Sequence, residues 1–179
     1  MSALDVGCRA ALVVVFVLAV ASKIRGRRSF DEFVRALGGF GFPAPLVGAP
    51  MAALVILCEA LAVVSLIAWP VVGYPAAAAL LVGFTAVIAA VLARGATVRC
   101  RCFGATDAPV GAAHLVRNTV LLGLAAAGGC ARLFDSSASA PATLAVVATA
   151  GALAGFLASR LDDLLFVFGS DSSRRQRRT

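Results

Sequence analysis

Two cysteines separated by one residue are the first candidates for chemistry in this chain. Cys100 and Cys102 lie in the segment Arg94-Gly-Ala-Thr-Val-Arg-Cys-Arg-Cys-Phe-Gly104, where Arg99 and Arg101 flank them. A nearby cation favours the thiolate, which is the nucleophilic form of cysteine. A disulfide across so short a loop would be strained and easily reduced, which suits thiol–disulfide exchange better than structural cross-linking.

The spacing of this pair leaves two other interpretations open. The cysteines are also small enough to be inert packing residues in a loop, or they could form half of a metal site. A zinc site needs about four ligands, and the only histidine of the chain is His114. Because other ligands are scarce, we expect no metal.

Glu59 is the second candidate, because it lies inside an apolar run beside Cys58. An ionisable group within a membrane is costly unless it is paired or functional. Lys23 and Arg117, near the ends of other apolar runs, are its candidate partners. Two interpretations stay open for Glu59. Either it is neutral, or paired with one of these cations, and has only a structural role, or it takes part in proton transfer.

The elements that must position these residues are membrane helices. Hydrophobic residues make up 61% of the 179 residues and charged residues only 14%, with a mean hydropathy of +0.96. Both percentages depart from those of soluble domains in the direction of membrane proteins. The sequence predicts an all-α polytopic membrane bundle with about five crossings, built on the apolar runs 10–22, 47–68, 71–93, 118–131 and 141–159.

The distribution of positive charge predicts the orientation. The formal net charge is +7, and most cations lie between alternate apolar runs and in the C-terminal tail. By the positive-inside rule the N-terminus is outside and the C-terminus inside a bacterial cytoplasmic membrane, which places Cys100 and Cys102 on the cytoplasmic face. The basic tail, residues 170–179, is expected to be disordered and to contact anionic membrane lipid. No basic face with aromatic readers is present, so nucleic acid is not an expected partner.

Several local features give further expectations. Gly151 and Gly155 form a G-x-x-x-G pattern, which permits close helix packing in lipid but also arises by chance in sequences rich in Ala and Gly. Cys8 and Cys130 fall at the outer ends of their runs, so they are either a disulfide or two small apolar residues. Trp69 to Pro75 is expected to be a short link with its aromatic residues at the interface. The first run could also be a cleaved signal peptide, but the basic cluster directly after it favours a membrane helix.

The sequence resembles the MauE family of methylamine-utilisation membrane proteins, which are grouped with DoxX-like proteins. The resemblance covers about residues 6–131, and its most specific part is the Cys-x-Cys-Phe-Gly element after Arg94-Gly95. Its other parts are Ala21-Ser-Lys-Ile-Arg25 with Phe30-Asp-Glu-Phe33-Val-Arg35-Ala-Leu37, Cys58-Glu-Ala60 and His114-Leu-Val-Arg-Asn118.

The resemblance implies a four-helix membrane domain over residues 1–131, an additional transmembrane helix over 132–169 and the tail over 170–179. Members are associated with maturation or export of the small subunit of methylamine dehydrogenase, which contains many disulfides. Carried over by position, Cys100 and Cys102 would be the redox pair, and Glu59, Lys23 and Arg117 the intramembrane polar positions. The implied partners are a thioredoxin-like protein or an exported client that contains disulfides.

We therefore expect thiol–disulfide or electron transfer, in which one thiolate attacks a partner disulfide and the other resolves the mixed disulfide. Glu59 would transfer a proton or orient a quinone; the sequence establishes no cofactor. Two alternatives stay open. The first is a non-catalytic membrane scaffold or export subunit, for which Cys100 and Cys102 would be dispensable. The second is a small-molecule transporter centred on Glu59, although no paired half-repeats of broken helices support it.

Overall fold

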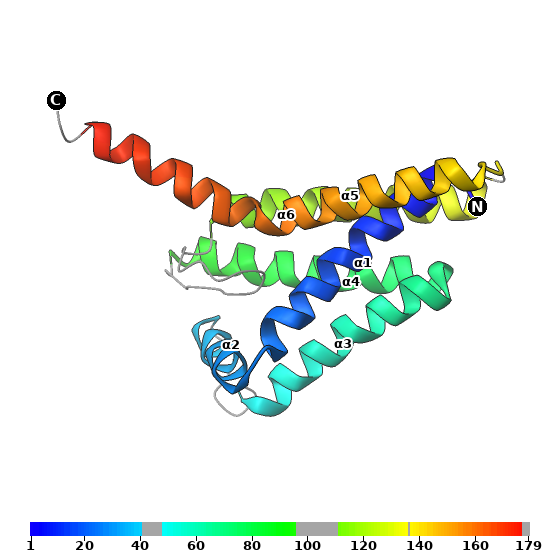
Figure 1. Ribbon diagram of the computed structural model, residues 1–179. Helices are drawn as coiled ribbons and strands as arrows, with labels where there is room; N and C mark the ends of the chain where they lie inside the picture. Colours follow the sequence, from blue (N-terminus) through cyan, green and yellow to red (C-terminus); the bar gives the residue numbers. More distant parts are fainter. Residues whose placement is uncertain (41–47, 96–110, 136, 177–179) are drawn as a thin grey trace.

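All regular secondary structure in the described part of the chain is helical. The computed structural model describes residues 1–40, 48–95, 111–135 and 137–176, with only the backbone described at 112 and over 161–176. Arg99, Cys100, Arg101 and Cys102 lie outside these ranges. Within them the chain forms six helices (Figure 1): α1 (Ala3–Ile24), α2 (Arg27–Gly39), α3 (Ala49–Ala68), α4 (Pro70–Ala93), α5 (Ala112–Phe134) and α6 (Pro141–Gln176).

Four of these helices are long and apolar enough to cross a membrane. They are α1, α3, α4 and the Pro141–Arg160 part of α6. Large apolar side chains such as Leu54, Leu57 and Leu61 are more than half exposed, as lipid-facing residues of a membrane helix would be. The predicted all-α polytopic membrane fold is confirmed. The fifth expected crossing, α5, contains His114, Arg117, Asn118 and Arg132 and is not among the four, so its crossing stays a prediction.

The helices pack as a closed ring with one helix outside it. Helix α1 contacts α3 and α5, and α4 contacts the same two helices, so α1, α3, α4 and α5 enclose a common core. Leu12, Phe16, Leu66, Leu81 and Leu121 fill that core and are essentially inaccessible. Helix α6 lies along the outer side of α1 (Figure 1). The positions of α1, α3, α4 and α5 agree with the expected four-helix core.

The contact between α1 and α6 depends on glycine. A Cβ atom added to Gly151 would collide with the backbone oxygen of Gly7, and one added to Gly155 would collide with that of Ala11. The G-x-x-x-G pattern therefore brings two helix backbones into direct contact within this chain. These contacts favour the packing interpretation of the pattern over its occurrence by chance.

Helices α3 and α4 form a tight hairpin, which differs from the expected interfacial link. Helix α3 ends at Ala68 and α4 begins at Pro70, leaving Trp69 alone between them. Tyr74 is 3% exposed within α4, and its hydroxyl lies 2.8 Å from Oδ1 and 2.9 Å from the backbone oxygen of Asp5. The expectation of an interfacial Tyr74 was wrong, because its hydroxyl finds these acceptors on α1.

Helix α2 lies in a segment where the positive charges predict only a basic loop. Phe33 and Leu37, one helical turn apart, are buried against α3 and α4, while Arg28 on the other side is 89% exposed. The helix closes one end of the four-helix ring, and the Arg94 guanidinium donates to the backbone oxygen of Phe40 over 2.9 Å. Gly95, with φ of +64°, allows the chain to leave α4 at this point.

Helix α6 continues to Gln176, into the segment expected to be a disordered tail. Once a helix has started, each further residue adds a hydrogen bond at little cost, so a polar sequence can extend it. Residues 177–179 lie outside the described ranges. The three-part division of the chain at residues 131 and 169 stays a prediction.

Candidate functional site

A buried ion pair joins α1 to α3. The Lys23 ammonium lies 2.7 Å and 2.9 Å from the two carboxylate oxygens of Glu59, and the two side chains are 2% and 0% exposed. Lys23 also donates to the backbone oxygen of Ala19 over 3.3 Å and lies 5.1 Å from the ring centre of Phe33. These contacts offset the loss of hydration that burial of both charges entails.

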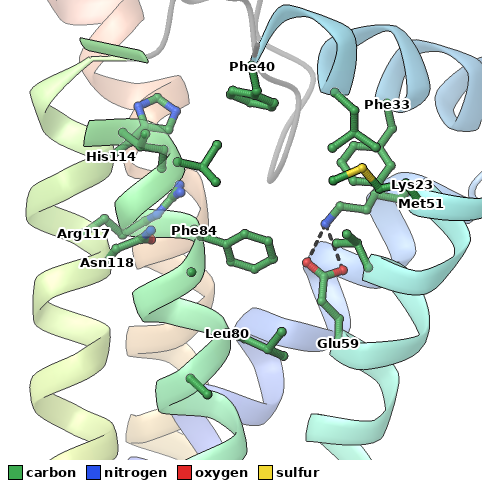
Figure 2. A pocket seen from close by; sticks show the side chains of 16 residues that line it. Lys23, Phe33, Phe40, Met51, Glu59, Leu80, Phe84, His114, Arg117 and Asn118 are labelled. Atoms are coloured by element: carbon green, nitrogen blue, oxygen red, sulfur yellow. Dashed lines mark hydrogen bonds and ion pairs between the residues drawn. The ribbon is translucent and has the colours of Figure 1, made fainter. Parts of the chain in front are cut away.

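The pair borders a cavity of about 240 Å³ inside the ring of helices. The walls come from the last turn of α1, from α2, from the first half of α3, from α4 and from the first turns of α5. Most of the lining is apolar. Figure 2 shows the Phe84 ring projecting into the space between the Lys23–Glu59 pair and Arg117. Phe33 and Phe40 lie at the end that α2 closes.

A second polar group faces the ion pair from α5. His114, Arg117 and Asn118 are spaced i, i+3 and i+4, so they share one face of the helix, and each is less than 9% exposed. Figure 2 shows Arg117 and Asn118 on the opposite wall from Lys23 and Glu59. Among the described residues, neither Nδ2 nor Oδ1 of Asn118 has a hydrogen-bond partner. The cavity therefore has polar groups at opposite walls and apolar surface between them.

Three predicted site residues meet at this cavity: Glu59, Lys23 and Arg117. The sequence does not distinguish between the two candidate partners of Glu59. In the structure Glu59 pairs with Lys23, and Arg117 lies across the cavity. Cys58, next to Glu59, is a free thiol at the edge of the core.

The remaining cysteine predictions have different outcomes. Cys8 is buried, Cys130 is exposed, and both are free thiols, so the disulfide between them is not formed. Their separate positions fit the alternative of two small apolar residues. Cys100 and Cys102, with Arg99 and Arg101, lie outside the described residues, and their role stays a prediction. Over the described ranges no three metal-ligating side chains come together.

Sequence reasoning missed Asn118 and the aromatic lining. In the sequence, Asn118 stands out only as part of a family motif, and His114 only in that motif and as a poor zinc ligand. The available signal was their spacing with Arg117, which puts three polar residues on one face of an otherwise apolar helix. Phe33 lies in a segment whose positive charges predict a loop, so the sequence does not indicate that it lines a cavity.

Comparison with known proteins identifies a family. The family model described as methylamine utilisation protein MauE matches residues 1–132, which include α1 to α5 except for the last residues of α5. No curated protein and no solved structure matches the chain. The matched range ends before α6 begins.

Proposed function

Since the chain belongs to the methylamine utilisation protein MauE family, we propose that it transfers electrons between thiols and disulfides and so supports maturation of a partner protein. Cys100 and Cys102 are the exchanging pair of this proposal. The partner would be a thioredoxin-like protein or an exported client with disulfides; in the namesake pathway of the family it would be the small subunit of methylamine dehydrogenase.

The observation that supports the proposal best is the buried Lys23–Glu59 pair beside an apolar cavity. Charged groups are retained inside a membrane bundle mainly where they are paired or functional, and this pair borders a cavity. The cavity is lined by Ile88 near the end of α4 and by His114 in the first turn of α5. The segment that contains both cysteines connects these two helices in the sequence.

The exchange itself conserves atoms and electrons. A client thiolate attacks the Cys100–Cys102 disulfide, forms a mixed disulfide and releases one thiolate of the pair. The second client thiolate then attacks the mixed disulfide, so that the client leaves oxidised and the pair is left as two thiols. The reaction is reversible, and the same steps run backwards when the partner brings the disulfide.

A protein with Cys8, Cys58 and Cys130 replaced by serine isolates the pair and tests the proposal. In lipid nanodiscs it is mixed with reduced thioredoxin as a dithiol probe, and thiols are then trapped with a maleimide that adds mass. We expect Cys100 and Cys102 to shift from protected to labelled while thioredoxin becomes oxidised. A further Cys100→Ser/Cys102→Ser change should abolish thioredoxin oxidation. Oxidation at the same rate without the pair would contradict the proposal.

Labelling in intact cells with a membrane-impermeant maleimide gives the side of the membrane. Reaction of Cys100 and Cys102 only after prior reduction would indicate an oxidised pair outside, where exported clients mature. Reaction only after permeabilisation would agree with the charge distribution and restrict the exchange to cytoplasmic partners.

The cavity also favours a second candidate function, a small-molecule transporter centred on Glu59. A ligand-sized space between helices, bordered by an ion pair, is what a substrate site in a transporter requires. Under this alternative Glu59→Gln abolishes function while Cys100→Ser/Cys102→Ser retains it. Under the first proposal the cysteine change is the one that abolishes function.

A further inference from the structure

The size and lining of the cavity restrict what it can hold. A dry apolar cavity of about 150 Å³ holds a benzene ring, and this one, of about 240 Å³, has room for a ring with substituents. Phe33, Phe40 and Phe84 supply flat apolar surfaces against which a planar ring packs (Figure 2). Apart from the polar groups at its two opposite walls, the lining is apolar, so the cavity does not suit a charged metabolite.

Asn118 indicates the polar chemistry of the ligand. Its side chain is 1% exposed and borders the cavity, and neither of its amide atoms has a partner in the described part of the structure. A buried amide without hydrogen bonds is unfavourable, so a ligand that supplies them has a binding advantage. Nδ2 can donate to a carbonyl oxygen and Oδ1 can accept from a hydroxyl group.

The opposite wall has the complementary groups. Glu59 presents a carboxylate that can accept from a hydroxyl group, and Lys23 holds it in place with an ammonium. A ring with two oxygen substituents at opposite positions would therefore meet Asn118 at one oxygen and the Lys23–Glu59 pair at the other. Both walls can interact with a carbonyl as well as with a hydroxyl form of the ligand.

Two exposed residues in the cavity lining indicate how the ligand arrives. Ala79 and Gly83 line the cavity from α4, are one helical turn apart, and are exposed on the outside of the bundle. A Cβ atom added to Gly83 would meet nothing within 4 Å. Because α4 is a candidate membrane span, we expect this exposed part of the cavity lining to face lipid, so that a ligand entering there must dissolve in the bilayer.

We infer that the cavity binds the ring of a lipid-soluble quinone, between Asn118 on α5 and the Lys23–Glu59 pair, with access past Gly83. The binding site stands on the described residues alone; its redox role rests on the proposed function. In the proposed function, the two thiols of Cys100 and Cys102 lose two electrons and two protons as the S–S bond forms. The quinone takes up both and leaves as a quinol, which restores the disulfide for the next client.

Binding of menadione to the purified full chain in nanodiscs tests this inference, with the affinity measured by titration calorimetry. We expect Asn118→Leu and Gly83→Leu each to weaken binding by about tenfold or more, because one removes the amide and the other adds a large side chain at the exposed part of the cavity lining. Gly123→Leu is the matched control: Gly123 is also exposed, has open space around it and does not line the cavity. It should bind menadione like the wild type.

Two further measurements distinguish a loss of menadione binding from a loss of folding and from a loss of redox activity. Asn118→Leu should not lower the unfolding temperature of the ligand-free protein, because it removes only unpaired polar atoms. Cys100→Ser/Cys102→Ser should bind menadione with unchanged affinity even though it cannot reduce it. No menadione binding by the wild type, or equal affinity in Asn118→Leu, would overturn the inference. Menadione binding without thiol-dependent reduction would leave the site standing and count against the proposed function.

Discussion

Replacing Lys23 by methionine removes the cation of the buried ion pair and leaves the Glu59 carboxylate in the apolar core. At 2.7 Å and an effective dielectric constant of about 20, the lost attraction is roughly 6 kcal/mol. Part of this is recovered because the ammonium no longer has to be desolvated. We expect a net loss of about 3–5 kcal/mol in the free energy of unfolding, the range typical of buried pairs that lose one partner.

The double change Lys23→Met/Glu59→Leu separates burial from attraction. It removes both charges and keeps apolar side chains of similar size, so its free energy of unfolding should return to within about 1 kcal/mol of the wild type. Its activity should stay lost if Glu59 handles protons. The assay is unfolding in mixed micelles with rising dodecyl sulfate content, followed by circular dichroism.

The chain provides its own control for this experiment. Arg28 and Glu32 form an ion pair of 3.1 Å on α2, with Arg28 89% exposed, so Arg28→Met should cost less than about 0.5 kcal/mol. A cost for Lys23→Met no larger than that for Arg28→Met would contradict this prediction. A double variant no more stable than Lys23→Met would contradict it equally, because the cost would then not arise from an uncompensated charge.

Three further predictions concern helix packing, a buried hydrogen bond and a backbone conformation, and all use the same unfolding assay. Gly155→Leu should cost more than about 3 kcal/mol, because its Cβ meets the backbone of Ala11, which cannot move aside as a side chain would; stability within 1 kcal/mol of the wild type would mean that α6 does not pack there. Tyr74→Phe should cost about 1–3 kcal/mol by leaving Asp5 without its hydroxyl donor, and an unchanged unfolding temperature would show that the bond is absent. Gly95→Ala should cost about 1–2 kcal/mol through its positive φ, with no change if the chain leaves α4 in another conformation.

Much of the fold could be predicted from composition and run length. A crossing needs about 20 apolar residues, and this requirement is local, so the long runs predicted α3 and α4 almost directly. The amphipathic helix α2 was harder, because its apolar residues Phe33 and Leu37 lie in a basic segment. Charge density there predicted a loop, whereas the spacing of the two residues reflects burial against other helices.

The site was predictable only where a residue conflicts with its surroundings. Glu59 could be identified because a carboxyl group in an apolar run is costly, and this narrowed its partner to Lys23 or Arg117. Which of these forms the ion pair depends on how the helices pack, which no local pattern specifies. Asn118 illustrates the same limit, because whether an amide lacks a partner is a property of the tertiary structure. Tyr74 was placed wrongly because aromatic residues near a helix end usually mark the interface.

The contact between α1 and α6 has a consequence for how the protein is made. About 140 residues separate Gly7 from Gly151, which at about 5–20 residues per second takes the ribosome roughly 7–30 s. During that interval the first helix has entered the membrane, but the side that α6 will cover is still bare backbone and small side chains. Helix α6 thus completes the packing of α1 only after α3, α4 and α5 have been synthesised, and a chain that stops after Phe134 leaves α1 open to association with other membrane helices.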